Sequence, residues 1–279
     1  MRLGNLGTRS VILTEAGSLD VEQASLGLFP AEVAALYERW DEFRSWVRRG
    51  DFAVSAQPFN EAALGNPAPT PTQIFAIGLN YADHAKESGH DVPTVPPVFT
   101  KFPTSLTGPR GDIELPPGQV DWEVELVAVI GRHAHRVSRF DAWDYVAGLS
   151  VGQDISERML QLAGSPAQFS LGKSYPGFAP IGPVLVTPDE LLDKDDLELG
   201  CSINGEQMQK GRTSEMVFSV PELVSRLSAV TPLLPGDVIF TGTPAGVGLG
   251  RNPQRFLTVG DELHSYIIGI GDMHHRFVA

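Results

Sequence analysis

The sequence DWEVELVAVI, at residues 121–130, is the stretch that decides how the rest of the chain is interpreted. Its run of apolar residues predicts a buried β-strand. Side chains alternate between the two faces of a strand, so Glu123 and Glu125 are expected on the same face. The strand holds no Lys or Arg, and burying carboxylates is costly unless a cation compensates their charge. Ligands that are all oxygen favour Mg²⁺, Mn²⁺ or Ca²⁺ over Zn²⁺. The alternative is an edge strand whose acids face water.

A third acid follows another apolar segment, at residues 145–153. Asp154 comes at the end of this predicted strand, where acids often face a site instead of the core. Together with Glu123 and Glu125 it would give an octahedral cation three ligands and leave three positions for substrate and water. An anionic substrate then needs additional cations, and Arg158 and Lys173 are the candidates, although each could also be a solvated surface residue.

A histidine and a glutamate stand three residues apart, at His84 and Glu87, in a segment that we expect to be helical. This spacing places both on one face of a helix. A carboxylate beside an imidazole fixes its tautomer and raises its basicity, as a general base acting on water requires. Gly78 and Gly89 flank the segment and would let it move as a lid. The alternative is a pair of surface residues.

Other short patterns are less informative. The glycine-rich segment 241–248 follows a predicted strand and could offer backbone N–H groups to an oxyanion, or it could be a plain turn. It lacks the Lys of a phosphate-binding loop, and the chain has no GxGxxG or HExxH motif, so neither a nucleotide nor a zinc-protease site is indicated. The histidines at 133 and 135, and those at 274 and 275, are interpreted as exposed.

The composition narrows the class of partner. The chain has 279 residues and a formal net charge of −13 without a basic block, so nucleic acid and anionic membranes are poor partners. Cys201 is the single cysteine, which excludes an internal disulfide and fits the cytoplasm. The N-terminal residues lack the apolar core of a signal peptide, and no apolar run reaches the length of a membrane span.

The chain divides near residue 70. Short strands are expected within residues 1–25 and a helix over 31–49, whereas the proline-rich residues 57–73 predict a linker. We therefore expect a small N-terminal domain at 1–70 and a catalytic domain at 71–279. A further helix is expected from Ser219, which with Glu222 fits a capping box. Because strands dominate, the predicted fold class is α+β and β-rich.

These blocks, in this order, resemble the fumarylacetoacetate hydrolase superfamily over residues 72–271. The resemblance is carried by GLNYxDH at 78–84, DxExEL at 121–126, DxxxR at 154–158, GKS at 172–174, NGE at 204–206, and PGD at 235–237 running into TGTP at 241–244. One departure is SYPGF at 174–178, where family members often have Ser-Phe-Asp after the lysine.

The resemblance implies a mixed β-sandwich roll with a small N-terminal domain, and a homodimer. It implies Mg²⁺ or Mn²⁺ (Ca²⁺ in a crystal), with the metal ligands Glu123, Glu125 and Asp154. It also implies a water-activating dyad of His84 and Glu87 on a lid that orders when ligand binds. The positions used for substrate contact are Arg158, Gln161, Lys173 and Thr243, and Lys173 is also a candidate catalytic group.

The function implied is a Mg²⁺- or Mn²⁺-dependent hydrolase that cleaves a C–C bond in an acylpyruvate or related β-diketo acid. The substrate is then a small anionic 2-oxo acid that chelates the metal, water is activated by the His–Glu pair, and an enolate leaves. Two alternatives remain open. One is an oxaloacetate decarboxylase or 2-oxo acid tautomerase on the same metal site, and the other is a non-catalytic protein that binds metal and ligand.

Overall fold

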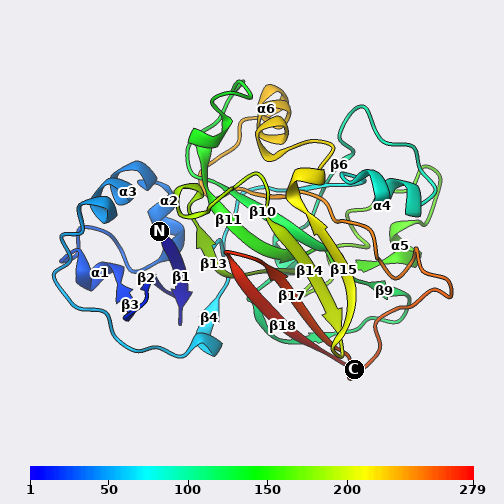
Figure 1. The fold of residues 1–279 in the computed structure, drawn as a ribbon, viewed down its shortest axis with the longest axis horizontal. Helices are drawn as coiled ribbons and strands as arrows, with labels where there is room; N and C mark the ends of the chain where they lie inside the picture. The colour runs from blue at the N-terminus through cyan, green and yellow to red at the C-terminus, as the bar shows by residue number, and fades with distance from the viewer.

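Three β-sheets dominate the computed structural model, which describes residues 1–279 (Figure 1). The main sheet has eleven strands along the path β3-β2-β1-β13-β11-β10-β16-β5-β6, with β4 beside β1 and β7 beside β13. A second sheet has the order β15-β14-β17-β18-β8, and β9 pairs with β12. Three pairs are parallel, namely β16–β5, β18–β8 and β13–β7, and the rest are antiparallel. The predicted β-rich fold with mixed sheets is confirmed.

The strands of the main sheet are β1 Arg2–Leu6, β2 Arg9–Thr14, β3 Gly17–Asp20, β4 Leu64–Gly65, β5 Ile74–Ile77, β6 Val98–Thr100, β7 Leu106–Thr107, β10 Val124–Ile130, β11 Val146–Gln153, β13 Ala179–Val186 and β16 Val238–Phe240. The other strands are β8 Arg110–Glu114, β9 Val120–Asp121, β12 Ser156–Glu157, β14 Glu198–Ile203, β15 Glu206–Arg212, β17 Glu262–Ile267 and β18 Gly271–Val278. The α-helices are α1 Val21–Ala24, α2 Val33–Tyr37, α3 Trp40–Arg49, α4 Ala82–Glu87, α5 Arg158–Gln161 and α6 Val220–Val230. Short 3₁₀ turns occur at Glu61–Ala63, Pro103–Ser105, Ala142–Tyr145, Pro188–Glu190 and Thr213–Glu215.

Strand β10 lies in the middle of the main sheet and is buried on both faces, which explains its continuous apolar run. Leu126, Ala128 and Ile130 face a core that they share with the second sheet. Val127 and Val129 face a separate core that includes the aromatic side chains of α3. The two sheets therefore pack face to face, with β10 between two hydrophobic cores.

The strand predicted at residues 121–130 is interrupted between β9 and β10. At this point side-chain amides replace the strand's backbone partners. The backbone N–H of Glu123 donates to Oε1 of Gln153 at 2.9 Å, and that of Val124 donates to Oε1 of Gln209 at 2.9 Å. The backbone hydrogen-bond ladder of the strand therefore breaks at Glu123, which carries the first of the three predicted metal-binding carboxylates.

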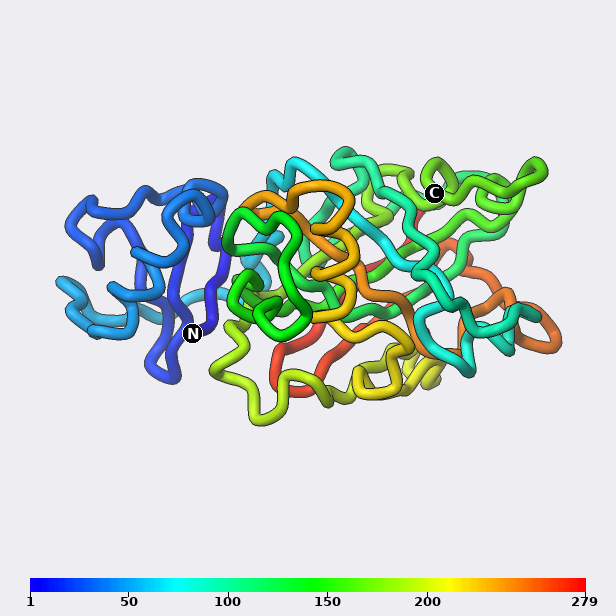
Figure 2. Tube along the Cα trace, turned by 90° about the horizontal axis from the view of Figure 1, so that it is seen from above, coloured from blue at the N-terminus to red at the C-terminus, as the bar shows by residue number.

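The N-terminal segment lies at one end of an elongated molecule (Figure 2), but its backbone continues the main sheet. Strand β1 pairs with β13, with Leu3 opposite Leu185. The single helix predicted over 31–49 is wrong in detail, because α2 and α3 are separated by Arg39, whose φ of −124° and ψ of 33° are not helical. The domain boundary near residue 70 stays a prediction, since pairing and core packing both cross it.

The proline-rich segment 57–73 is not a free linker, contrary to expectation. The backbone N–H of Gln57 donates to the carbonyl of Ser18 at 2.9 Å, and β4 pairs with β1. Ala68 is buried. The prolines therefore shape a packed connection, not a flexible one.

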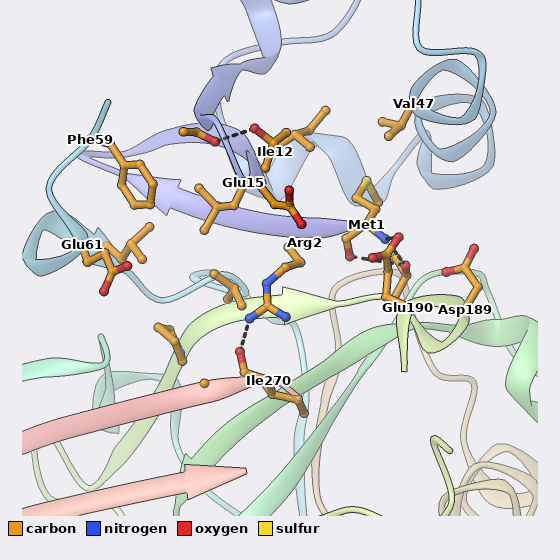
Figure 3. Close-up of a pocket in the computed structure, with 18 of the residues that line it drawn as sticks. Met1, Arg2, Ile12, Glu15, Val47, Phe59, Glu61, Asp189, Glu190 and Ile270 are labelled. Atoms are coloured by element: carbon orange, nitrogen blue, oxygen red, sulfur yellow. Dashed lines mark hydrogen bonds and ion pairs between the residues drawn. The ribbon is translucent and has the colours of Figure 1, made fainter. Parts of the chain in front are cut away.

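A cavity of about 890 Å³ lies where the N-terminal segment meets the body of the molecule (Figure 3). The guanidinium of Arg2 spans the junction, because Nη1 donates to the carbonyl of Gly269 at 2.9 Å and Nη2 to that of Ile270. The N-terminal amine contacts Oε1 of Glu190 at 2.5 Å. None of the predicted site residues lines this cavity.

Two local predictions near helix and strand ends need correction. Helix α6 begins after Ser219 as predicted, but the side chain of Ser219 makes no capping hydrogen bond, and Glu222 pairs with Arg226 at 2.6 Å instead. Both His133 and the neighbouring His135 are exposed as expected. Of the two C-terminal histidines, which belong to β18, His274 is exposed as expected, whereas the prediction is wrong for His275, which is buried. No helix in the structure is both long and apolar enough to cross a membrane.

Candidate active site and metal centre

The register between β10 and β11 brings the three predicted carboxylates together. Glu125 lies opposite Gly152 in this antiparallel pair, and Asp154, just beyond β11, donates its backbone N–H to the carbonyl of Glu123 at 2.9 Å. One carboxylate oxygen from each of Glu123, Glu125 and Asp154 lies within 4.8 Å of the others, and all three residues are buried. Gly152 is required here, because an added Cβ would lie 2.4 Å from Cγ2 of Val127.

Three buried cationic side chains surround these carboxylates. Lys173 Nζ lies 2.9 Å from Oε2 of Glu123 and 2.6 Å from Oδ2 of Asp154. Lys101 Nζ lies 2.5 Å from the other oxygen of Asp154, and Nη1 of Arg158 lies 2.7 Å from Oε1 of Glu123. Both predicted cations, Arg158 and Lys173, are therefore buried against the acids and are not solvated surface residues.

The charges in this cluster are not balanced at every carboxylate. Burial raises the pKa of Glu125 well above its usual value, and the nearby charges of Asp154 and Glu123 raise it further. Burial also opposes ionisation of Glu123, but the cations of Lys173 and Arg158 prevail and lower its pKa. Glu125 has no ion-pair partner within 4 Å, and its Oε2 accepts only the backbone N–H of Gly242, at 2.7 Å, among protein donors. An all-oxygen donor set that still has unbalanced negative charge fits a hard divalent cation.

The His84–Glu87 pair forms on α4, as the spacing predicted. Nδ1 of His84 lies 3.4 Å from Oε2 of Glu87, and both side chains are mostly buried. The backbone N–H of Gly246 donates to both carboxylate oxygens of Glu87, at 3.0 and 3.1 Å. Burial alone would raise the pKa of Glu87, but the hydrogen bonds from His84 and Gly246 lower it. Glu87 is therefore an anion held in place by a turn from a distant part of the chain.

A cavity of about 150 Å³ adjoins the cluster and is smaller than the roughly 300–1,000 Å³ typical of drug-sized ligands. Its polar lining consists mainly of side chains that the sequence had singled out, namely His84, Glu123, Arg158, Gln161, Lys173 and Thr243. Its apolar lining includes Leu79, Leu162, Phe169 and Val247. The lining of the cavity therefore combines charged and polar side chains with apolar ones.

Two of the residues predicted to bind substrate already have protein partners. The hydroxyl of Thr243 donates its only proton to the carbonyl of Val124 at 2.8 Å and accepts from Nε2 of Gln209 at 2.8 Å. Oε1 of Gln161 accepts from Arg158 at 2.9 Å. A role in substrate binding stays a prediction for both, and Thr243 could contribute only its oxygen lone pair.

Three polar residues of the site were missed in the sequence. Lys101 directly follows β6, and nothing in the surrounding sequence distinguishes it from a surface lysine. Gln209 connects Val124 to the glycine-rich segment from a strand more than eighty residues away. Asp121 was noted only as a residue of the acidic strand, although its carboxylate organises the neighbouring loop.

Asp121 links the guanidinium of Arg158 to the glycine-rich segment. Its Oδ2 lies 2.7 Å from Nη2 of Arg158, and its two oxygens accept the backbone N–H groups of Gly248 and Leu249 at 2.7 and 2.9 Å. Gly248 leaves no space for a side chain, because an added Cβ would lie 1.9 Å from the carbonyl oxygen of Arg255. The segment is thus a tightly anchored turn that presents N–H groups to protein carboxylates.

Comparison with known proteins assigns the family. A model of the fumarylacetoacetate (FAA) hydrolase C-terminal region matches residues 73–278. The chain belongs to the fumarylacetoacetate hydrolase family. The human mitochondrial oxaloacetate tautomerase FAHD2A is one of its curated relatives. It is 39% identical over 255 residues, which cover 89% of this chain and 80% of the relative.

Two solved structures share the whole fold of this chain. A crystal structure described as "a putative HpcE protein" from Mycobacterium smegmatis is 54% identical, with a TM-score of 0.96 that covers 100% of this chain and 99% of the other. Maleylpyruvate hydrolase from Sphingobium sp. SYK-6, solved with manganese(II) ion and pyruvate, is 28% identical with a TM-score of 0.82, covering 100% and 99% of the two chains. The predicted family and its mixed β-sandwich fold are confirmed.

The departure from the family pattern at residues 174–178 lies outside the small cavity. The hydroxyl of Ser174 accepts the backbone N–H of Phe102 at 3.0 Å, and Phe178 is fully buried beside Tyr175. This segment therefore supports the wall of the site and does not line it.

Proposed function

We propose that this protein is a divalent-metal-dependent hydrolase that cleaves a C–C bond in an acylpyruvate or a related β-diketo acid. The observation that carries the proposal is the His84–Glu87 pair, whose histidine borders the same cavity as Lys173 and Arg158. Hydrolysis needs a base that activates water, whereas tautomerisation and decarboxylation of a 2-oxo acid do not consume water. A buried base with its own anchored carboxylate therefore favours hydrolysis.

In this proposal Glu123, Glu125 and Asp154 hold the cofactor. Mg²⁺ or Mn²⁺ bound there supplies Lewis-acid polarisation and compensates the negative charge that develops on a 2-oxo acid. The Sphingobium relative solved with manganese(II) and pyruvate supports this choice of ion and of ligand class. The Lys173 ammonium, whose pKa is raised by Asp154 and Glu123 against the opposing effect of burial, stays charged and attracts the anionic end of the substrate.

The apolar residues in the lining of the cavity favour an acylpyruvate over a dicarboxylate. A carboxylate placed against Leu162, Phe169 and Val247 would lose its hydration without gaining a protein donor, which costs several kcal/mol. An apolar acyl group would instead gain from burial there. The substrate in this account has a charged 2-oxo acid end and an apolar acyl end.

The residues divide the work of hydrolysis as follows. Because a carboxylate can only accept, Nδ1 of His84 carries the proton shared with Glu87, and Nε2 is left to take a proton from water. The water oxygen bonds to the distal carbonyl carbon, and the bond from that carbon to the pyruvyl methylene breaks. The electron pair moves to the methylene carbon, which takes a proton from the nearest acid, assigned here to Lys173. The products are a carboxylic acid and pyruvate.

The second candidate activity is oxaloacetate tautomerase, for which a specific observation exists. The human relative FAHD2A bears that name and is 39% identical over most of both chains. Tautomerisation moves one proton between carbon and oxygen, and the same lysine and histidine could serve it. Oxaloacetate decarboxylation also stays open, since it needs only an electron sink.

The test is a product assay with added Mg²⁺ or Mn²⁺ on 2,4-dioxo acids and on oxaloacetate. Pyruvate released together with a second acid supports hydrolysis. Conversion of enol to keto oxaloacetate, followed by its ultraviolet absorbance, without cleavage of any dioxo acid would overturn hydrolysis in favour of the tautomerase. Release of CO₂ would identify the decarboxylase.

Replacing the proposed base gives the first prediction. His84→Ala should lower kcat for C–C hydrolysis by about 10²–10⁴-fold, the usual contribution of a general base. The matched control is His133→Ala, which removes an exposed histidine away from the cavity and should leave kcat unchanged. If His84→Ala binds Mg²⁺ normally and still hydrolyses at a near-normal rate, the base assignment is wrong.

A homodimer and a cytoplasmic location stay predictions.

A further inference from the structure

A second group of metal-binding side chains lies on the β17–β18 hairpin, away from the carboxylate cluster. His264 of β17 and His274 of β18 are directly opposite one another in the antiparallel register. Their imidazole rings stack, with centroids 4.4 Å apart and planes 19° from parallel. Asp272 lies two residues before His274 on the same strand and therefore on the same face of the sheet.

The two imidazoles point a nitrogen at the same carboxylate. Nε2 of His274 lies 2.7 Å from Oδ2 of Asp272, and Nε2 of His264 lies 3.8 Å from that atom. One donor atom from each of the three residues falls within 4.8 Å of the other two. Two imidazole nitrogens and one carboxylate oxygen, converging from an antiparallel ladder, form one side of a coordination shell.

We propose that His264, Asp272 and His274 form a second metal site, which takes a borderline transition-metal ion such as Zn²⁺. Imidazole nitrogen suits Zn²⁺, Ni²⁺ and Cu²⁺, whereas Mg²⁺ prefers an all-oxygen shell. The three side chains are partly open to solvent, so an ion can enter and a water can complete a tetrahedral shell. The two sites of the chain would then sort ions by donor type.

Arg110 sets the strength of this site. It lies on β8, directly opposite His274 in the parallel β18–β8 pair, and its Nη2 is 3.6 Å from Oδ2 of Asp272. In the metal-free protein the guanidinium compensates the carboxylate, so a bound dication must compete with it. Arg110 and Asp272 also border the cavity at the junction with the N-terminal segment, which offers the guanidinium space to withdraw.

The test is calorimetric titration with Zn²⁺ in excess Mg²⁺, which keeps the carboxylate cluster occupied. The wild-type chain should bind one more Zn²⁺ ion than His264→Ala or His274→Ala does. If the variants still bind the same number of ions, their affinity for Zn²⁺ should be at least about tenfold weaker than that of the wild type. The control is His133→Ala/His135→Ala, which removes an exposed His-x-His pair that has no converging carboxylate. This variant should bind Zn²⁺ like the wild type.

Arg110→Met provides a variant in which binding should improve. Removing the competing positive charge should tighten Zn²⁺ binding, whereas general damage to the hairpin would weaken it. Loss of the same visible Co²⁺ absorption band in both single histidine variants would support the site by a second readout. Equal Zn²⁺ stoichiometry and affinity in wild type, His264→Ala and His274→Ala would overturn the proposal.

Discussion

At the residue scale, the most informative side chain is one that the sequence did not single out. Lys101 is fully buried, and its ammonium contacts Asp154 and the backbone carbonyl of Lys173. Burying a lysine is costly, and its pKa is lowered by that burial. Such a residue persists only where buried negative charge compensates it. Lys101 thus compensates part of the negative charge of the buried carboxylates. The acidic strand, considered by itself, predicts that a metal ion compensates that charge.

We predict that Lys101→Met makes the stability of the fold more dependent on Mg²⁺ than that of the wild type. In EDTA the variant should lose about 3–5 kcal/mol of unfolding free energy, the usual cost of removing one partner from a buried pair. Excess Mg²⁺ should restore part of this loss, because an ion that binds only the folded state stabilises it. Urea unfolding with and without Mg²⁺ measures both quantities.

The control for this change is Lys210→Met, whose side chain is half exposed and pairs with Glu198 at the surface. It should change stability by no more than about 1 kcal/mol and show no added Mg²⁺ dependence. A loss in Lys101→Met that is the same in EDTA and in Mg²⁺ would contradict the charge-compensation account.

At the scale of elements, helix α4, which carries the proposed base, depends on a turn that is distant in sequence. Gly246 holds the carboxylate of Glu87 through its backbone N–H and has a φ of +109°, in the region that favours glycine. An added Cβ there would lie 2.3 Å from the carbonyl oxygen of Met208. The glycine-rich segment therefore orients the proposed base, His84, through Glu87, a role different from the oxyanion binding that its composition suggested.

We predict that Gly246→Ala lowers kcat by about 10–100-fold, because displacing the turn shifts Glu87 and small misplacements of catalytic groups have effects of that size. The matched control is Gly260→Ala. That residue also has a positive φ, +95°, but no atom lies within 4 Å of the added Cβ. It carries the same backbone strain without the clash, so kcat should be retained. Equal loss of kcat in both variants would mean that general destabilisation, not Glu87, is responsible.

The elements differ in how far the sequence predicts them. The β10–β11 pair and its three acids follow from strand alternation and from acids at strand ends, because both rules act over a few residues. The strand break before Val124 depends on side-chain partners elsewhere in the chain, Gln153 and Gln209. Such long-range hydrogen bonds leave no local pattern, and Lys101 was missed for the same reason.

At the scale of the whole molecule, one sheet connects the N-terminal segment to the catalytic region. Strand β1 pairs with β13, and Trp40 and Phe43 of α3 share a hydrophobic core with Val127 and Val129 of β10. An added Cβ at Gly131 would lie 2.6 Å from Trp40, so the two regions are in tight contact. Cores shared in this way unfold cooperatively.

We therefore predict a single unfolding transition. One variant would keep only the N-terminal tryptophans, Trp40 and Trp46, and another only Trp122 and Trp143. In each variant the urea midpoint from fluorescence should coincide with the midpoint from far-ultraviolet circular dichroism. In the variant that keeps Trp40 and Trp46, a fluorescence midpoint at lower urea than the circular dichroism midpoint of the same variant would show that residues 1–70 unfold separately.

The central claim is that Glu123, Glu125 and Asp154 bind one hard divalent ion, and the most direct test is equilibrium Mn²⁺ binding followed by the electron paramagnetic resonance signal of free Mn²⁺. The account predicts uptake of one Mn²⁺ per chain by the wild type and by Glu206→Gln, an exposed control. It predicts binding weakened by at least about tenfold in Glu125→Gln. Absence of Mn²⁺ uptake by the wild type, or unchanged uptake in Glu125→Gln, would contradict it.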